Sequence, residues 1–204
     1  MFGMTRTLSL RRRLLTWRAR WSIPSLLAAR DERRLISLVA AANGGIAILI
    51  ISALARLIDL PLLFPALGPS AFILFSSPFS RAAAPRSVIL GHFSAIAAGV
   101  TVWHFVTLIC GTPVSLDMSG WPILASASLA LAASCVLLVW LACPHAPACA
   151  TALIIALGAA NGWSDLLGMA SGVVLLTAQA VLISRIAGIN VPIWFPRPRN
   201  THYV

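Results

Sequence analysis

The sequence predicts an all-α membrane protein with six apolar segments, and three observations support this fold class. Hydrophobic residues make up 59% of the 204 residues and charged residues only 10%, and the mean hydropathy is +0.92. A water-soluble chain of this length does not bury that much apolar surface. The net charge is +10, and the arginines cluster outside the apolar segments. We therefore interpret the positive charge as a signal of membrane topology and lipid contact, and we expect no nucleic-acid partner.

The N-terminal segment, residues 1–36, precedes the first apolar stretch and is rich in arginine. Nine of the fifteen basic residues of the chain lie within positions 1–34. Trp17 and Trp21 stand among these arginines, a pattern typical of a segment lying on an anionic membrane surface. We therefore expect a cytoplasmic or interfacial segment that contacts anionic lipids. A transit peptide is the alternative.

Four of the six apolar segments are long enough to cross a bilayer. Each has about 22 residues, which at 1.5 Å per residue covers ~30 Å of hydrocarbon. We place them at 37–58, 88–110, 121–142 and 164–187. The other two, at 62–77 and 147–160, are shorter, and proline or glycine marks their starts. They are expected to be short or broken helices surrounded by protein.

The arginines also predict how the short segments are placed. With six crossings and a cytoplasmic N-terminus, fourteen arginines lie inside and only Arg56 lies outside. If the short segments were re-entrant loops, Arg81 and Arg86 would move to the outer side. The positive-inside rule therefore predicts six crossings, with both termini and the tail at 188–204 in the cytoplasm.

The two halves of the membrane region, 37–110 and 121–187, share one pattern of a long, a short and a long segment. At an offset of 81 residues, FPALGPSAFIL aligns with HAPACATALII, which places Ser70 on Thr151. Because three crossings per half is an odd number, the second half must be inverted relative to the first. Paired short segments interrupted by proline or glycine indicate the midplane binding site of a transporter.

Small residues recur at four-residue spacing in the long segments, which predicts close helix packing. The three sets are Gly91, Ala95 and Gly99; Ser126, Ala130 and Ser134; and Ser164, Gly168 and Gly172. The chain contains no Gly-rich phosphate loop, paired catalytic acids or metal-ligand cluster. We therefore expect no metal, no cofactor and no catalytic residue.

Three stretches of the chain resemble one known family. The residues at 143–158 read CPHAPACATALIIALG, which is similar to the PHPPAGATALI pattern of the HPP family of integral membrane proteins. The residues at 84–92 read APRSVILGH, which resembles the PRNVIxGH of that family, and LGPSAFILFSSP at 67–78 is also similar. Ala146, Cys149 and Ser87 depart from the pattern. The resemblance covers roughly residues 37–187.

The resemblance implies a function and a location. Some HPP family members are nitrite transporters of plastids and photosynthetic bacteria, so the resemblance implies transport of a small inorganic anion such as nitrite. We also expect a multi-pass protein of the bacterial inner membrane.

The resemblance and the repeat together predict an anion site between the starts of the two short segments. Helix starts present unpaired N–H groups and a partial positive charge, both of which favour a small anion. Small residues allow the anion to approach the backbone, and Ser70 and Thr151 add hydroxyl donors. The residues expected at the site are Gly68, Pro69, Ser70, Ala71, Cys149, Ala150 and Thr151, together with His145, His92, Arg86 and Asn43.

Three of these polar residues have alternative interpretations. His145 either braces the broken helix or meets the anion at the cytoplasmic entrance, and the ordinary pKa of histidine, about 6.5, would also suit proton coupling. Arg86 either sets the topology or gathers anions at the cytoplasmic mouth. Asn43 lies at membrane depth, where it either lines the path or joins helices.

Two further function classes stay open. A membrane sensor or assembly protein without transport activity would have the same apolar segments, and a homo-oligomer is compatible with each class. The GPSA stretch at 68–71 also resembles the nucleophile setting of an intramembrane serine protease, with a histidine as base. Because GxS is a three-residue pattern and the rest of the chain resembles another family, we expect a transporter and not an enzyme.

Overall fold

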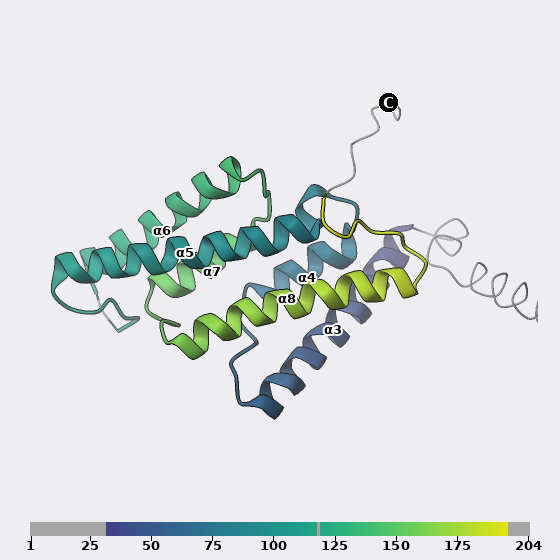
Figure 1. Cartoon of the computed structure of the whole chain (residues 1–204), viewed down its shortest axis with the longest axis horizontal. Helices are drawn as coiled ribbons and strands as arrows, with labels where there is room; N and C mark the ends of the chain where they lie inside the picture. The colour runs from purple at the N-terminus through teal and green to yellow at the C-terminus, as the bar shows by residue number, and fades with distance from the viewer. Residues whose placement is uncertain (1–31, 118, 196–204) are drawn as a thin grey trace, which may run out of the picture.

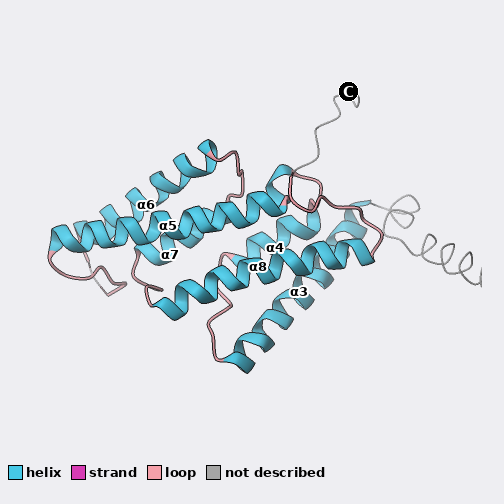
Figure 2. Ribbon diagram, in the orientation of Figure 1, coloured by secondary structure: helices cyan, strands magenta, loops and turns pink. Residues whose placement is uncertain are grey.

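The computed structural model of the protein describes residues 32–117 and 119–195. The predicted interfacial residues up to position 31 and the tail from position 196 onward lie outside this part. Within it the chain forms six α-helices and one short 3-10 helix, and no strand is present among these residues (Figure 1, Figure 2). The predicted all-α fold class is therefore confirmed for the described part of the chain.

The helices follow the predicted order of long, short and long in each half. Four are long and apolar enough to span a membrane, namely α3 (Glu32–Ile58), α5 (Pro85–Cys110), α6 (Trp121–Trp140) and α8 (Trp163–Ile186). Two apolar helices are short, α4 (Leu67–Ser76) and α7 (Pro147–Ala156). The 3-10 helix η1 (Arg81–Ala83) lies between α4 and α5. The starts of α3 and α5 lie before the predicted ones, because arginine-containing turns continue each helix beyond its apolar stretch.

Proline, glycine and aspartate residues set several helix ends. Pro85 and Pro147 occupy the first positions of α5 and α7, where the missing N–H costs no helix hydrogen bond. After α5 the chain turns at Gly111, whose φ of 69° is the left-handed conformation favoured by glycine. At the start of α8 the Gly162 N–H donates to Asp165 Oδ2 at 3.0 Å, and that carboxylate also suits the positive end of the helix.

The six helices form two packing groups. One buried core is built mainly by α3, α4 and α8, and a second by α5, α6 and α7. Figure 1 shows α5, α6 and α7 at one side of the molecule and α3, α4 and α8 at the other, and α5 also packs against α8. The group of α3 and α4 from the first half of the chain therefore includes α8 from the second half. The group of α6 and α7 from the second half includes α5 from the first.

Small residues allow the close approaches between these segments. Gly168 and Gly172 of α8 face the loop before α4 so closely that a Cβ atom at either position would meet backbone carbonyl oxygens. A Cβ atom at Gly99 of α5 would lie 2.9 Å from the carbonyl oxygen of Ala152 in α7. The predicted close packing is confirmed at these glycines, whereas Ser164 of the same pattern is exposed.

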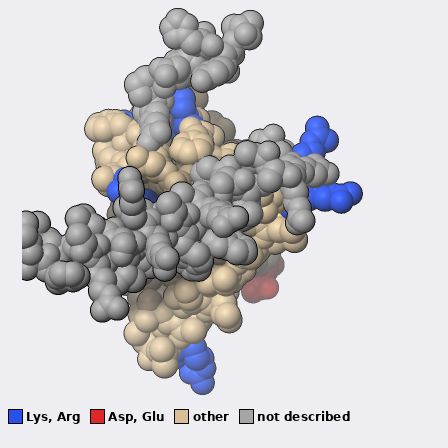
Figure 3. Space-filling view, turned by 90° about the vertical axis from the view of Figure 1, so that its right-hand side faces the viewer, with Lys and Arg blue, Asp and Glu red and all other residues tan. Residues whose placement is uncertain are grey.

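The outer surface of the helices is apolar, and several of the exposed tryptophans lie at helix ends. Trp121 and Trp163, at the starts of α6 and α8, are each 83% exposed, and Trp140, at the end of α6, is 80% exposed. Tryptophan favours the membrane–water interface. Figure 3 shows arginine side chains projecting at the edges of one face, while most of its visible described surface carries no charge. This surface suits a protein embedded in a bilayer.

Candidate functional site

Four polar side chains meet inside the bundle, and we call Ser70, His92, His145 and Thr151 the polar cluster. Ser70 lies in the first turn of α4, His92 in α5, His145 two residues before α7 begins, and Thr151 within α7. Each of the four is 0% exposed. All four belong to the predicted site residues, and the structure brings them together from both halves of the chain.

Hydrogen bonds join the polar cluster into one continuous chain. The Oγ atom of Ser70 lies 3.0 Å from Nε2 of His92 and 2.9 Å from Nε2 of His145. The other ring nitrogen of His92, Nδ1, lies 2.8 Å from Oγ1 of Thr151. Nδ1 of His145 lies 2.8 Å from the carbonyl oxygen of Ala82. The hydrogen-bonded chain therefore runs from Thr151 in α7 through α5 and α4 to His145 ahead of α7, and it ends on η1.

The Ala82 carbonyl assigns the hydrogen positions along this chain. A carbonyl only accepts, so Nδ1 of His145 donates, and in the neutral ring Nε2 then accepts from the Ser70 hydroxyl. Ser70 in turn accepts from Nε2–H of His92, whose Nδ1 accepts from the Thr151 hydroxyl. With two neutral rings every bond in the chain is satisfied and all the protons point in one direction.

The Ser70 hydroxyl has a second acceptor within reach. Its Oγ lies 2.8 Å from the carbonyl oxygen of Ala66 in the preceding turn. The hydroxyl proton can therefore turn from His145 to Ala66. Oγ then still accepts from Nε2–H of His92, but Nε2 of His145 loses its donor, because the proton of that neutral ring stays on Nδ1 against the Ala82 carbonyl.

The local sequence explains how His145 reaches this place. The His145 N–H donates to the carbonyl of Cys143 at 2.7 Å, which forms a tight turn between the end of α6 and the start of α7. On α5, a Cβ atom at Gly91 would lie 3.3 Å from Cβ of His145 and 3.6 Å from that of Ala148. A larger residue at Gly91 would push this turn away from α5, so the small residue positions the ring.

The first turn of α4 contacts the residue His145 ahead of α7, but His92 stands between the hydroxyls of Ser70 and Thr151. Ser70 in α4 bonds directly to His145 ahead of α7, and it reaches Thr151 only through the ring of His92. The ring of Phe64 also packs in a T-shaped arrangement with this ring, with centroids 6.1 Å apart and an interplanar angle of 84°. The space between Ser70 and Thr151 is therefore filled by a side chain from α5.

The small residues predicted beside the hydroxyls occupy different surroundings. Gly68 and Pro69 are exposed on α4. Ala71 is 3% exposed and packs in the core shared with α3 and α8. Cys149 and Ala150 of α7 are half-buried. Ser70 and Thr151 thus carry the polar contacts of these two segments, and their neighbours pack around them.

Arg86 and Asn43, which were also predicted at the site, lie outside the polar cluster. The Arg86 Nη2 donates to the Leu141 carbonyl at 3.0 Å, its backbone N–H donates to the Trp194 carbonyl at 3.2 Å, and its guanidinium lies 5.9 Å from the ring centroid of Phe195. It joins the start of α5 to the end of α6 and to the chain after α8. Asn43 is half-buried in α3.

Sequence reasoning did not identify two members of the site. The Ala82 carbonyl is a backbone group, which leaves no signal in the sequence. Phe64 is the residue that aligns with His145 at the 81-residue offset, and its contact with the His92 ring depends on the path of the loop before α4. His145 was expected either to brace the broken helix or to meet the anion at the entrance, and its buried ring makes a backbone hydrogen bond to Ala82, which fits the bracing alternative.

The helices, the apolar surface and the family match together define the class of the protein. Four long and two short apolar helices that enclose a buried polar cluster define a polytopic membrane protein. The model of the HPP transmembrane region matches residues 30–192, so the chain belongs to the HPP family. This confirms the family predicted from the sequence. Comparison with curated proteins and with solved structures gives no match.

Proposed function

We propose that this HPP family protein carries a small inorganic anion across the membrane, with nitrite as the first candidate. The observation that carries the proposal is the polar cluster, in which two hydroxyls and two imidazoles from both chain halves meet at 0% exposure. Buried polar groups inside a membrane bundle are costly and commonly mark a substrate path. Family membership supports the same function class.

The chemistry of the polar cluster suits an anion. Its members supply O–H and N–H donors, and its hydrogen-bond partners are hydroxyls, imidazoles and backbone carbonyls. No carboxylate of the described residues takes part in these bonds. The N–H groups of Leu67, Gly68 and Ser70 in the first turn of α4 already donate to backbone carbonyls, so the hydroxyls and imidazoles are the donors that remain for an anion. A small anion displacing the Ser70–His92 contact would receive donors from both sides.

Access to the polar cluster requires helix movement, and the packing supports a mechanism for it. We propose that the two halves are inverted repeats. Gly91 and Gly172 are 81 residues apart and lie on the third helix of their halves, α5 and α8. Gly91 faces His145 ahead of α7, and Gly172 faces Leu62 ahead of α4, so each contacts the segment before the short helix of the other half. Rocking of one packing group against the other would then expose the cluster to each side in turn.

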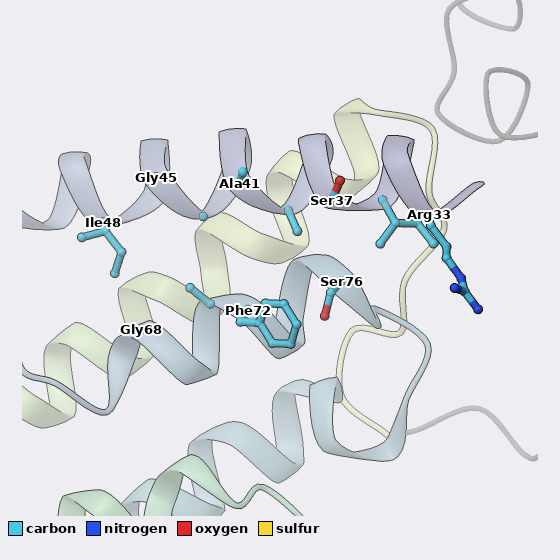
Figure 4. Close-up of a pocket in the computed structure, with 12 residues that line it drawn as sticks. Arg33, Ser37, Ala41, Gly45, Ile48, Gly68, Phe72 and Ser76 are labelled. Carbon is cyan, nitrogen blue, oxygen red and sulfur yellow. The ribbon is translucent and has the colours of Figure 1, made fainter. Parts of the chain in front are cut away.

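The arginine positions support six crossings with cytoplasmic termini. Arg33 at the start of α3 lies at the same end of the α3–α4 pair as Ser76, after which the chain enters η1 with Arg81 (Figure 4). Arg185 lies in the last turn of α8, and Arg56 lies at the opposite end of α3. The positive-inside rule then assigns the arginine-rich end to the cytoplasm. The bacterial inner membrane is our proposed location.

The test is counterflow into liposomes that contain the purified protein, with nitrite, nitrate, formate, chloride and sulfate as substrates. We expect nitrite exchange, and we expect the double variant Ser70→Ala with Thr151→Val to reduce it at least tenfold. The matched control pairs Ser94→Ala with Thr177→Val, because each of these hydroxyls donates to a carbonyl of its own helix. Protein-free liposomes measure passive entry of nitrous acid at each pH.

The outcomes separate the function classes. If the two double variants reduce nitrite exchange equally, the polar cluster has no specific role in the transport path. Absence of exchange for all five anions, together with a co-purifying partner protein, would favour a sensor or assembly role.

One contact favours the hydrolase as a second candidate. The 2.9 Å distance between Ser70 Oγ and His145 Nε2 lies in the range of a nucleophile and its base. Two features oppose it: Ser70 is 0% exposed, and the third member is the Ala82 carbonyl instead of a carboxylate. Covalent labelling by a fluorophosphonate probe, lost in Ser70→Ala and retained in Ser94→Ala, would favour the hydrolase over the transporter.

A further inference from the structure

A groove of about 680 Å³ runs between α3 and α4. Figure 4 shows the two helices side by side, with the start of α3 and the end of α4 at the same end of the groove. Small residues of α3 form one wall, and Phe72 of α4 projects between the helices. From Arg33 to Ile48 the α3 wall is about 22 Å long at 1.5 Å per residue.

The lining of the groove has the polarity of an amphiphile. Along most of its length the α3 wall consists of Ala40, Ala41, Gly44, Gly45 and Ile48. The polar lining gathers at one end, where Ser37 and Ser76 lie on the two helices and the exposed Arg33 side chain projects beyond the groove (Figure 4). An occupant therefore needs a long apolar part and a negative or polar group at one end only.

Both the length and the charge of the groove match a phospholipid. One leaflet contributes about 15 Å of the ~30 Å hydrocarbon thickness, so a 22 Å groove extends through the acyl region of one leaflet to the headgroup level. An arginine at that level binds a phosphate through charge-assisted, bidentate hydrogen bonds.

A second copy of the chain fits the groove less well. Copies with the same orientation in the membrane would bring two Arg33 side chains together at one membrane face, and like charges repel there.

We propose that this groove is a binding site for an anionic phospholipid, with one acyl chain lying between α3 and α4 and the phosphate on Arg33. Gly68, Ala71 and Phe72 of α4 line the groove, and Ser70 of the same helix belongs to the buried polar cluster. The lipid therefore contacts the helix that positions Ser70. The proposal stands on the groove itself and does not depend on which substrate the protein carries.

The test measures lipid binding by native mass spectrometry of the full chain in detergent, titrated with phosphatidylglycerol or phosphatidylcholine of identical acyl chains. We expect phosphatidylglycerol to bind at least tenfold more tightly, and Arg33→Gln to remove this difference, as the loss of a charge-assisted bond predicts. Arg56→Gln, at the opposite end of α3, is the charge control and should leave the preference unchanged.

Filling the groove tests the position of the acyl chain. A Cβ atom at Gly45 has no heavy atom within 4 Å, so Gly45→Leu occupies the groove without disturbing the core. We expect this variant, and Ala41→Leu, to weaken both lipids at least tenfold, while Ala53→Leu on an exposed part of α3 leaves binding intact. Unchanged circular dichroism and elution volume serve as the folding control.

Three outcomes would overturn the proposal. Undiminished lipid binding in both Gly45→Leu and Ala41→Leu would place the lipid elsewhere. Equal affinity for the two headgroups in the wild type would remove the role of Arg33. Dimers that disappear in Gly45→Leu, without any lipid bound to the wild-type groove, would assign the groove to a second copy of the chain.

Discussion

Replacing Thr151 by valine removes one hydroxyl from the polar cluster and nearly preserves the volume and branching of the side chain. The hydroxyl lies 2.8 Å from Nδ1 of His92, and both residues are 0% exposed. The variant therefore leaves a buried ring nitrogen without its donor, and no water can replace the lost bond unless the packing opens. Thr151→Val isolates one link of the hydrogen-bonded chain.

The expected magnitude follows from this geometry. An unsatisfied buried acceptor costs about 1–3 kcal/mol in soluble proteins, and hydrogen bonds between membrane helices contribute about 0.6 kcal/mol on average and at most about 1.7 kcal/mol. We therefore expect Thr151→Val to lower the free energy of unfolding by about 1–1.5 kcal/mol, where these two ranges overlap.

Thr177→Val is the matched control for this prediction. Thr177 is 3% exposed, and its hydroxyl donates to the Val173 carbonyl in its own helix at 2.8 Å. Such bonding back to the preceding turn adds little to helix stability, so we expect a change within about 0.5 kcal/mol. The two substitutions remove the same atoms from similarly buried sites and differ only in the partner of the hydroxyl.

Unfolding of the purified variants in mixed micelles, followed by circular dichroism against the fraction of denaturing detergent, measures both free energies. Equal losses for the two variants would refute the reasoning, because they would show that the His92–Thr151 bond carries no stability of its own. A double-mutant cycle with Ser70→Ala extends the test. Since both hydroxyls bond to the ring of His92, we expect a coupling of about 0.5 kcal/mol or more.

Three further predictions concern packing and helix ends. Gly99→Ala should destabilise the protein by about 1–3 kcal/mol, because the new Cβ would press on the backbone of α7. Gly45→Ala has open space around the new Cβ and should stabilise α3 by up to about 1 kcal/mol. Melting temperatures in detergent measure both variants, and a lower melting temperature for each of them would contradict the packing. Asp165→Ala removes the acceptor of the Gly162 N–H and should cost about 0.5–2 kcal/mol in the same assay, and an unchanged melting temperature would show that this cap is not used. Arg86→Gln removes the guanidinium bond to the end of α6 and should accelerate amide hydrogen exchange around residues 141–143, with Arg56→Gln as the control that leaves this exchange unchanged.

The location of the polar cluster could be predicted only in part. The histidines and hydroxyls of the polar cluster were all identified from the repeat and the family motifs. Their connection was not, because Ser70 and His145 are 75 positions apart and the sequence does not state which face of α5 turns toward them. The acceptor at Ala82 is a main-chain group, so no residue type indicates it.

The sequence by itself determined the membrane class, the family, the order of long and short segments and the glycines at close contacts. These follow from hydropathy, helix breakers and short motifs, which act over one or two helical turns. Only the tertiary structure decided that α5 and α8 each pack with the opposite half, that His92 separates Ser70 from Thr151, and that a groove opens between α3 and α4. The physical reason is that an apolar helix in a membrane has no single face marked for burial. Its partners depend on the fit of small side chains from distant segments.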